Sequence, residues 1–159
     1  MKKIIYALFG LTGLQIMLVR CHTETSGLMA SYIKNPTPYN ISLKYYRGGQ
    51  LAQRDTLNFV AGETKNVFNS IPMDGSPTYA DAVQLFYDSL LITFDNKQAT
   101  HYGWSKAGKN PDAISFDHPR NIFNKNNWTI KIFRNTSKHF DGEAIYIFTE
   151  DDYVNAKSR

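Results

Sequence analysis

The sequence predicts an all-β domain, an antiparallel β-sandwich of about seven to eight strands that ends in a short helix. The 159 residues include ten Tyr and ten Phe, residue types that are enriched in strands. Several segments alternate polar and apolar side chains, which is the period of a strand with one buried face. Gly, Pro, Asn and Asp separate these segments at short intervals, as turns between antiparallel strands require.

Three strands are expected in the first half of the domain. Residues 40–46 alternate apolar and polar side chains, and Gly48 and Gly49 then suit a tight hairpin turn. Residues 51–60 form the return strand. Residues 64–68 form a short third strand after another turn.

The stretch 80–94 allows two interpretations. We favour two short strands broken at Asp88-Ser89, because the second half of the stretch is a continuous apolar run that ends at a turn. The alternative is a helix, because Thr78 and Asp81 have the spacing of a capping box. In that case the apolar residues that recur at helical spacing would be Val83, Phe86, Tyr87 and Leu90.

The second half of the domain alternates strands with one long irregular region. Residues 99–104 form a strand that pairs with the preceding one, and 105–127 form an irregular region with Gly and Pro. Residues 128–134 and 143–148 alternate as strands do, and the second has the apolar character of a central strand. Thr149 and the acidic residues after it are typical of the start of a helix.

These segments predict a single domain over residues 32–159, a sandwich of the immunoglobulin-like or transthyretin-like kind. A partly open barrel is the alternative arrangement of the same strands. A chain of this length has room for one such core and a targeting segment. The small and polar residues before the domain, 21–31, are expected to form a tether.

The N-terminus has the layout of a secretory signal peptide, which is expected over residues 1–20. Lys2 and Lys3 precede an apolar run, residues 4–19. This run is shorter than the roughly 20 residues that a membrane-spanning helix needs. The sequence therefore predicts export from a bacterial cytoplasm.

The single cysteine, Cys21, directly follows the apolar run. One cysteine cannot form a disulfide within the chain. At this point the sequence resembles bacterial lipoproteins, whose lipobox places a Leu three residues before a Cys that becomes diacylated. Leu18 and Val19 fit this pattern, whereas Arg20 stands where that family has Gly, Ala or Ser. This departure leaves cleavage of the signal open.

The lipobox-like start, the Asn-rich composition and the C-terminal run Thr-Glu-Asp-Asp-Tyr are together similar to small lipoproteins of Bacteroidota-type bacteria. The resemblance implies a protein held in the cell envelope by lipid on Cys21, and it implies no activity. His22, in place of an acidic residue after the cysteine, favours the outer membrane over the inner one by analogy with lipoprotein sorting. An ordinary secreted protein and an uncleaved membrane anchor are the alternatives.

The charge of the chain argues against nucleic acid as a partner. Three of the 18 basic residues precede Cys21, which leaves 15 basic residues against 14 acidic ones in the rest of the chain. A nucleic-acid-binding protein needs a concentrated basic face. The four histidines share no metal-ligand spacing and no glycine-rich phosphate loop is present, so no cofactor or metal is expected.

The cluster with the strongest indication of binding is His101-Tyr102-Gly103-Trp104, with Asp117 and His118 at the far end of the following loop. Aromatic faces beside polar groups can stack on sugar rings, and loops carry many binding sites. We therefore expect a non-enzymatic module that contacts another envelope protein or a glycan. The alternative for Tyr102 and Trp104 is that they only cover the end of the core.

A second hypothesis is a small carbohydrate-active enzyme or another hydrolase that uses carboxylates in the loop 105–127. It predicts a concave pocket in which Asp112, Asp117 or His118 faces His101 or another titratable group. A contact module predicts instead a flat, partly apolar sheet face or sheet end.

Overall fold

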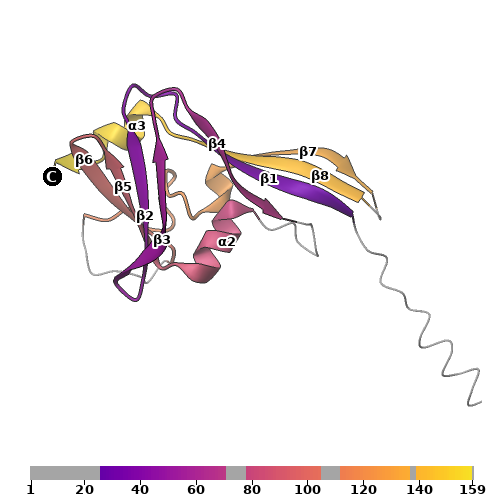
Figure 1. The fold of residues 1–159 in the computed structure, drawn as a ribbon, viewed down its shortest axis with the longest axis horizontal. Coiled ribbons are helices and arrows are strands. Elements are labelled where there is room, and N and C mark those ends of the chain that lie inside the picture. The colour runs from indigo at the N-terminus through magenta and orange to yellow at the C-terminus, as the bar shows by residue number, and fades with distance from the viewer. Residues whose placement is uncertain (1–25, 71–77, 105–111, 137–138, 159) are drawn as a thin grey trace, which may run out of the picture.

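The computed structural model describes residues 26–70, 78–104, 112–136 and 139–158, which form two sheets and short helices (Figure 1). The fold is mostly β and sandwich-like, as the composition and the alternating segments predicted. Cys21 and the expected signal peptide lie outside the described residues.

The elements are as follows. Sheet A contains, in spatial order, β4 (Thr64–Ser70), β1 (Ser26–Lys34), β8 (His139–Ile147) and β7 (Thr129–Asn135). Sheet B contains β3 (Gln50–Phe59), β2 (Ile41–Arg47), β5 (Ser89–Phe94), β6 (Lys97–Tyr102) and β9 (Lys157–Ser158). The helices are α2 (Tyr79–Phe86), the 3-10 turn η1 (Lys125–Asn127) and α3 (Glu150–Val154).

Sheet A corrects two expectations. β1 runs parallel to β8 along its whole length, so the sandwich is mixed and not purely antiparallel. β1 also begins at Ser26, within the range 21–31 that was expected to be a tether. The small residues Gly27, Ala30 and Ser31 gave the segment the composition of a linker. In the structure, Ala30 and Ser31 are buried in a central strand, where small side chains pack closely.

α2 corrects the interpretation favoured for the stretch 80–94. The capping box is present: Thr78 N donates to Asp81 Oδ2 at 2.8 Å, and Asp81 N donates to Thr78 Oγ1 at 3.4 Å. The helix buries Tyr79 and Val83, one turn apart, on the face that covers the core. Capping and this amphipathic face together outweigh the strand propensity of the aromatic residues. Only the second expected strand forms, as β5.

The remaining expected strands are confirmed as β2, β3, β4, β6, β7 and β8. The hairpin between β2 and β3 turns at Gly48 and Gly49, whose φ angles of 58° and 75° favour glycine. The expected C-terminal helix is α3, where Thr149 N donates to Asp152 Oδ2 at 2.7 Å.

The core lies between sheet B and the half of sheet A that faces it. Its largest fully buried side chains come from both sheets and, for Phe123 and Phe148, from segments outside the strands: Tyr45, Tyr146, Phe59, Phe94, Phe123, Phe148, Met29, Ile33, Ile41, Leu43, Leu90 and Ile92. Burying one such side chain contributes about 1.5–3 kcal/mol. Trp128 is also buried, and its Nε1 donates to Ile122 O at 2.8 Å.

The described part of the irregular region 105–127 is organised by asparagine side chains. Asn121 is fully buried, and its Nδ2 donates to the carbonyl oxygens of Tyr102 (3.0 Å), Ile114 (3.2 Å) and Ser115 (2.8 Å). Its Oδ1 accepts from Phe123 N at 2.8 Å. The loop is therefore fixed by side-chain hydrogen bonds in place of a strand ladder.

Candidate functional site

A hollow of about 210 Å³ opens between α2 and the neighbouring edge strands of the two sheets, β3 and β4. We call this hollow the α2 groove. Its lining is apolar and aromatic, and consists of Tyr45, Leu57, Val67, Phe68, Tyr79, Ala82, Val83, Phe86 and Tyr87.

The hydroxyls at the floor of the α2 groove bind each other. Tyr45 Oη and Tyr79 Oη form a hydrogen bond, and the rings of Tyr45 and Tyr87 lie 4.9 Å apart in a tilted arrangement. The groove therefore offers mainly apolar surface to an incoming group. A dry apolar cavity of about 150 Å³ is large enough to bind benzene, so this volume suits one aromatic or branched apolar side chain.

A second hollow of about 140 Å³ adjoins the α2 groove and shares Phe86 and Tyr87 with it. Trp104 and Leu85 both line this second hollow, and they are 50% and 75% exposed. Arg47, Gln84 and Asp88 complete the lining and give it polar edges.

Hydrogen bonds hold the backbone around this second hollow in place. Gln84 Nε2 donates to Gly103 O at 2.6 Å, which ties α2 to the segment that carries Trp104. Asp88 Oδ2 accepts from Gly48 N at 2.5 Å, which ties the end of α2 to the β2–β3 hairpin. The aromatic side chains of the two hollows are therefore presented on a fixed frame.

Of the sequence-predicted site residues, only Trp104 lines either of these two hollows. His101 is 1% exposed, and its Nδ1 accepts from Ile122 N at 3.1 Å. Burial, followed by the nearby charges of His118 and Arg120, lowers the pKa of His101 to about 3. His101 is thus a neutral core residue at neutral pH, and an external ligand does not reach it in this conformation.

Tyr102, Asp117 and His118 do not converge with Trp104. Tyr102 is half-buried, and its backbone N donates to Ile114 O at 3.1 Å. Asp117 is exposed, and His118 Nδ1 accepts from Arg120 N at 3.1 Å.

The pocket that the enzyme hypothesis requires is not formed among the described residues of the loop. Asp112 is exposed and forms an ion pair with Lys157 at the C-terminal end of the chain. His118 is near enough to His101 for its charge to affect the pKa of His101. Because His101 is buried in the core, none of Asp112, Asp117 and His118 faces it across an open pocket.

Sequence reasoning missed most of the α2 groove. The available signal was the helical spacing of Val83, Phe86 and Tyr87, which belonged to the less favoured interpretation of this stretch. The contributions of Val67 and Phe68 arise from packing between strands and helix, which leaves no local pattern.

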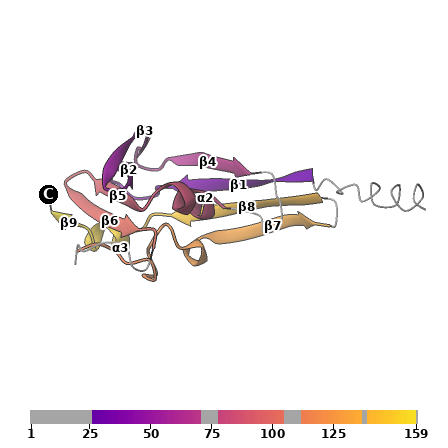
Figure 2. The ribbon, with the colours of Figure 1, turned by 90° about the horizontal axis from the view of Figure 1, so that it is seen from below.

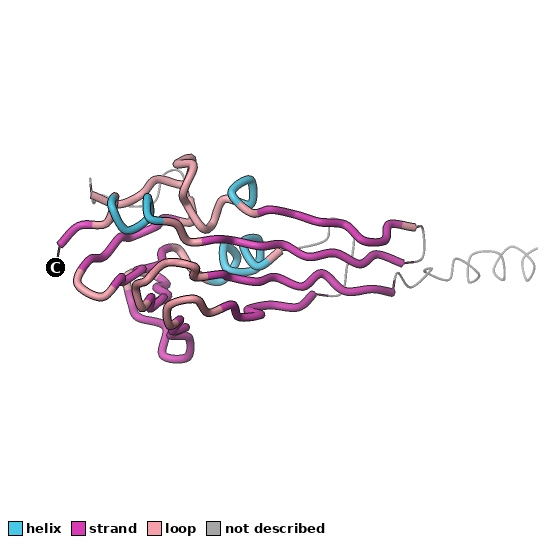
Figure 3. Tube along the Cα trace, turned by 90° about the horizontal axis from the view of Figure 1, so that it is seen from above, coloured by secondary structure: helices cyan, strands magenta, loops and turns pink. Residues whose placement is uncertain are grey.

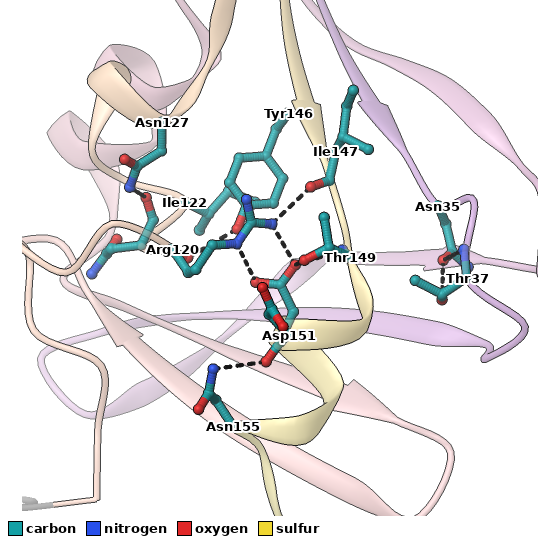
Figure 4. Close-up of polar contacts among 12 residues, drawn as sticks. Asn35, Thr37, Arg120, Ile122, Asn127, Tyr146, Ile147, Thr149, Asp151 and Asn155 are labelled. Atoms are coloured by element: carbon teal, nitrogen blue, oxygen red, sulfur yellow. Dashed lines mark hydrogen bonds and ion pairs between the residues drawn. The ribbon is translucent and has the colours of Figure 1, made fainter.

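A polar cluster joins α3 to sheet A (Figure 4). Arg120 Nε donates to Asp152 Oδ1 at 2.9 Å, and Arg120 Nη2 donates to Asp152 Oδ2 and to Ile147 O, the latter at 2.7 Å. Tyr146 Oη donates to Arg120 O at 2.9 Å, and the guanidinium lies over the Tyr146 ring. The Asp152 side chain is 3% exposed, so this is a largely buried ion pair.

Two groups of the cluster have raised pKa values. Burial disfavours the charged guanidinium, but the hydrogen bonds to Asp152 and the electrostatic interactions with Tyr146, Asp152 and Asp151 together outweigh this effect and raise the pKa of Arg120. Burial also raises the pKa of Tyr146 well above its usual value. The arrangement therefore fixes α3 in position.

The described ranges do not bring three or more His, Cys, Asp or Glu side chains together as a metal site needs. No helix formed by these residues has the length and apolar character required to cross a bilayer. Comparisons with protein-family models, curated protein sequences and solved structures give no match to this chain. The case for a function therefore depends on the residues themselves.

Proposed function

We propose that this chain is a membrane-anchored lipoprotein of the cell envelope whose β-rich domain is a contact module. In this proposal the α2 groove binds an apolar or aromatic side chain of another envelope protein, and Trp104 contacts the residues beside it. The observation that carries the proposal is the pair of adjoining hollows that share Phe86 and Tyr87.

The chemistry of the groove favours a protein over a glycan. A sugar needs several hydrogen-bonding groups beside an aromatic face, whereas the hydroxyls at the floor of the α2 groove bind each other. Phe86 is 59% exposed and Leu85 is 75% exposed, so large apolar side chains surround the opening. Exposed aromatic anchors next to a pocket with polar edges are typical of protein contact sites.

The anchor is supported by the sequence alone. Lys2 and Lys3, the apolar run 4–19 and Cys21 have the order found in lipoprotein signals. Each acyl CH₂ group buried in the bilayer contributes about 0.8 kcal/mol, so two or three chains would hold the domain at a membrane. The outer membrane is the proposed location.

The comparison with immunoglobulin-like or transthyretin-like sandwiches is part of the same proposal. Two facing sheets support it, and sandwiches of this kind are common in contact domains at cell surfaces. The parallel β1–β8 pair is a departure from their antiparallel order.

Filling the groove tests the contact. A photo-crosslinking amino acid at Phe86, introduced in the native host, should give one discrete adduct with an envelope protein. Ala82→Trp, which places an indole in the groove, should abolish this adduct, whereas the control Val154→Trp on α3 should not. An adduct that survives Ala82→Trp, or no discrete adduct at all, would contradict the proposed contact.

Metabolic labelling with a palmitate analogue tests the anchor independently. The wild-type chain should be labelled and Cys21→Ala should not. Equal labelling of the two would show that lipid is not attached at Cys21.

A further inference from the structure

Sheet A extends beyond sheet B and the helices (Figures 1 and 3). Its far end carries exposed apolar side chains. We call this region the open end of sheet A. Its exposed apolar residues are Leu28 (46%), Ile130 (46%), Ile132 (53%) and Phe133 (67%). Figure 2 shows β4, β1, β8 and β7 side by side in this region.

The inner face of the open end borders a wide depression of about 530 Å³. Met29, Ile130, Ile132 and Phe140 form its apolar side on the sheet, and its polar side consists of Thr78, Asp81, Lys125 and Asn126. Gly142 lies between Met29 and Ile132 in the register of the sheet. A Cβ there would come within 2.9 Å of Lys131 O and 3.0 Å of Met29 Sδ, so only glycine keeps this face flat.

Addition of another strand to the edge of the sheet is not favoured. β7 has a register shift against β8 between Ile132 and Arg134, at the open end itself. β4 has one opposite β1 between Ser31 and Tyr32, where the open end passes into the covered half. Irregularities of this kind bend an edge strand and interrupt its row of free backbone groups. The apolar side chains, and not the strand edges, are therefore the part of the open end suited to a contact.

Charges near the open end are balanced among the described residues. Lys131 Nζ lies 3.2 Å from Glu143 Oε1, and Arg134 Nε lies 4.0 Å from Asp141 Oδ2. Contact with this surface would therefore be apolar in character and would not depend on a strongly charged partner.

The chain enters the domain at this same end. β1 begins at Ser26, five positions after Cys21, and five residues span at most about 17 Å. Leu28 lies opposite Asp141 in the register, one position before the row that joins Met29, Gly142 and Ile132, so it projects from the opposite face of the sheet. A lipid on Cys21 would therefore hold the open end within a short distance of the bilayer.

We propose that the open end of sheet A meets the lipid bilayer end-on, so that apolar side chains of both faces, among them Leu28 from one face and Ile132 from the other, together with Phe133, are inserted at the boundary between headgroups and acyl chains. This inference rests on the proposed lipid anchor at Cys21. The tether makes the bilayer the first surface that these side chains meet, and their apolar area adds to the anchoring of the acyl chains. The C-terminus and α3, at the opposite end of the molecule, then point away from the membrane (Figure 1).

Fluorescent probes on single introduced cysteines test this orientation in the acylated protein. Cys21 is the only native cysteine and is blocked by lipid in this proposal, so Leu28→Cys and Phe133→Cys can each carry an environment-sensitive fluorophore. Val154→Cys is the matched control, because Val154 is 62% exposed at the opposite end. The proteins are reconstituted into phosphatidylcholine vesicles with and without nitroxide-labelled lipid.

The two probes at the open end should shift to shorter wavelength and lose about half of their fluorescence to nitroxide lipid, because side chains at this depth lie near the labelled acyl region. The probe at Val154 should do neither. A blue shift without quenching would mean that protein, either a second copy or another segment of this chain, covers the open end, and would overturn the inference.

Flotation of the same vesicles separates the two proposals. If the labelled proteins float with the vesicles but all three probes behave alike, the orientation is wrong and the anchor stands. If the proteins do not float, the anchor itself is wrong, and the orientation fails with it.

Discussion

The two halves of sheet A contain similar side chains in different surroundings. In the half that faces sheet B, Ile33 and Tyr146 are completely buried, whereas at the open end Ile132 and Phe133 are 53% and 67% exposed. β1 and β8 continue from one half to the other in an unbroken register. The difference therefore comes from coverage by sheet B and α2. It suggests that the covered half stabilises the fold, while the apolar residues of the open end serve a contact.

The largest expected effect comes from a matched pair of truncations within sheet A. Ile33→Ala should lower the free energy of unfolding by about 3 kcal/mol, because it removes buried methylene groups and leaves a cavity. Ile132→Ala should lower it by less than about 1 kcal/mol, because half of that side chain is already in water. Urea denaturation of both variants measures the difference. Equal losses would mean that the open end contributes to folding as the covered half does.

The Arg120–Asp152 pair should give the next largest effect. Asp152→Ala leaves a partly buried guanidinium without its carboxylate and should cost about 2–3 kcal/mol, less than for a fully buried pair. Asp112→Ala breaks an exposed ion pair with Lys157 and should cost less than about 1 kcal/mol. If thermal unfolding shows the two variants to be alike, the cluster does not fix α3 in the way described.

His101 should make the stability of the covered half depend on pH. Its pKa is about 3 in the folded protein and about 6.5 in the unfolded chain. Below pH 6.5 His101 therefore binds a proton in the unfolded chain but not in the folded protein. The free energy of unfolding falls as the pH drops toward 3. Between pH 7 and pH 5.5 the loss should be about 1 kcal/mol, measured by urea denaturation at the two pH values.

His101→Asn keeps an acceptor for Ile122 N and should remove most of the pH dependence of stability. His118→Gln should leave that pH dependence unchanged. The same pH dependence in all three proteins would show that His101 is not the group responsible.

The smallest expected effect concerns the boundary between the two halves, where α2 begins. Thr78→Ala removes the side-chain half of the capping box and should cost about 1 kcal/mol. Thr78→Ser keeps the hydroxyl and should restore most of that loss. A thermal unfolding series of the three proteins measures this, and a Thr78→Ser variant as unstable as Thr78→Ala would contradict a capping role.

The sequence predicted the elements with strong local patterns. The alternation in 40–46 and 143–148 corresponds to β2 and β8, and Gly48 and Gly49 form the expected turn. The capping spacing of Thr78 and Asp81 was visible, but the aromatic residues that follow have high strand propensity, and this misled the assignment. Only packing of Tyr79 and Val83 on the core decides between the two.

Long-range features could not be predicted. The parallel pairing of β1 with β8 joins segments more than 100 residues apart, and the small residues of β1 give no strand signal. For the candidate site, Trp104 was expected and lines a hollow, whereas the α2 groove beside it depends on where β3, β4 and α2 meet. The burial of His101 could have been predicted from the alternation of its strand, because His101 lies on the same strand face as Ala99.

Amide hydrogen exchange tests the comparison between the two regions most directly. The acylated protein on vesicles is compared with the same chain from residue 21 onward that carries Cys21→Ser and no lipid. We predict slower exchange on vesicles in β7 and at the start of β1, and unchanged exchange in α3. Unchanged exchange in β7, or protection of α3 in its place, would contradict the account that the open end of sheet A meets the membrane.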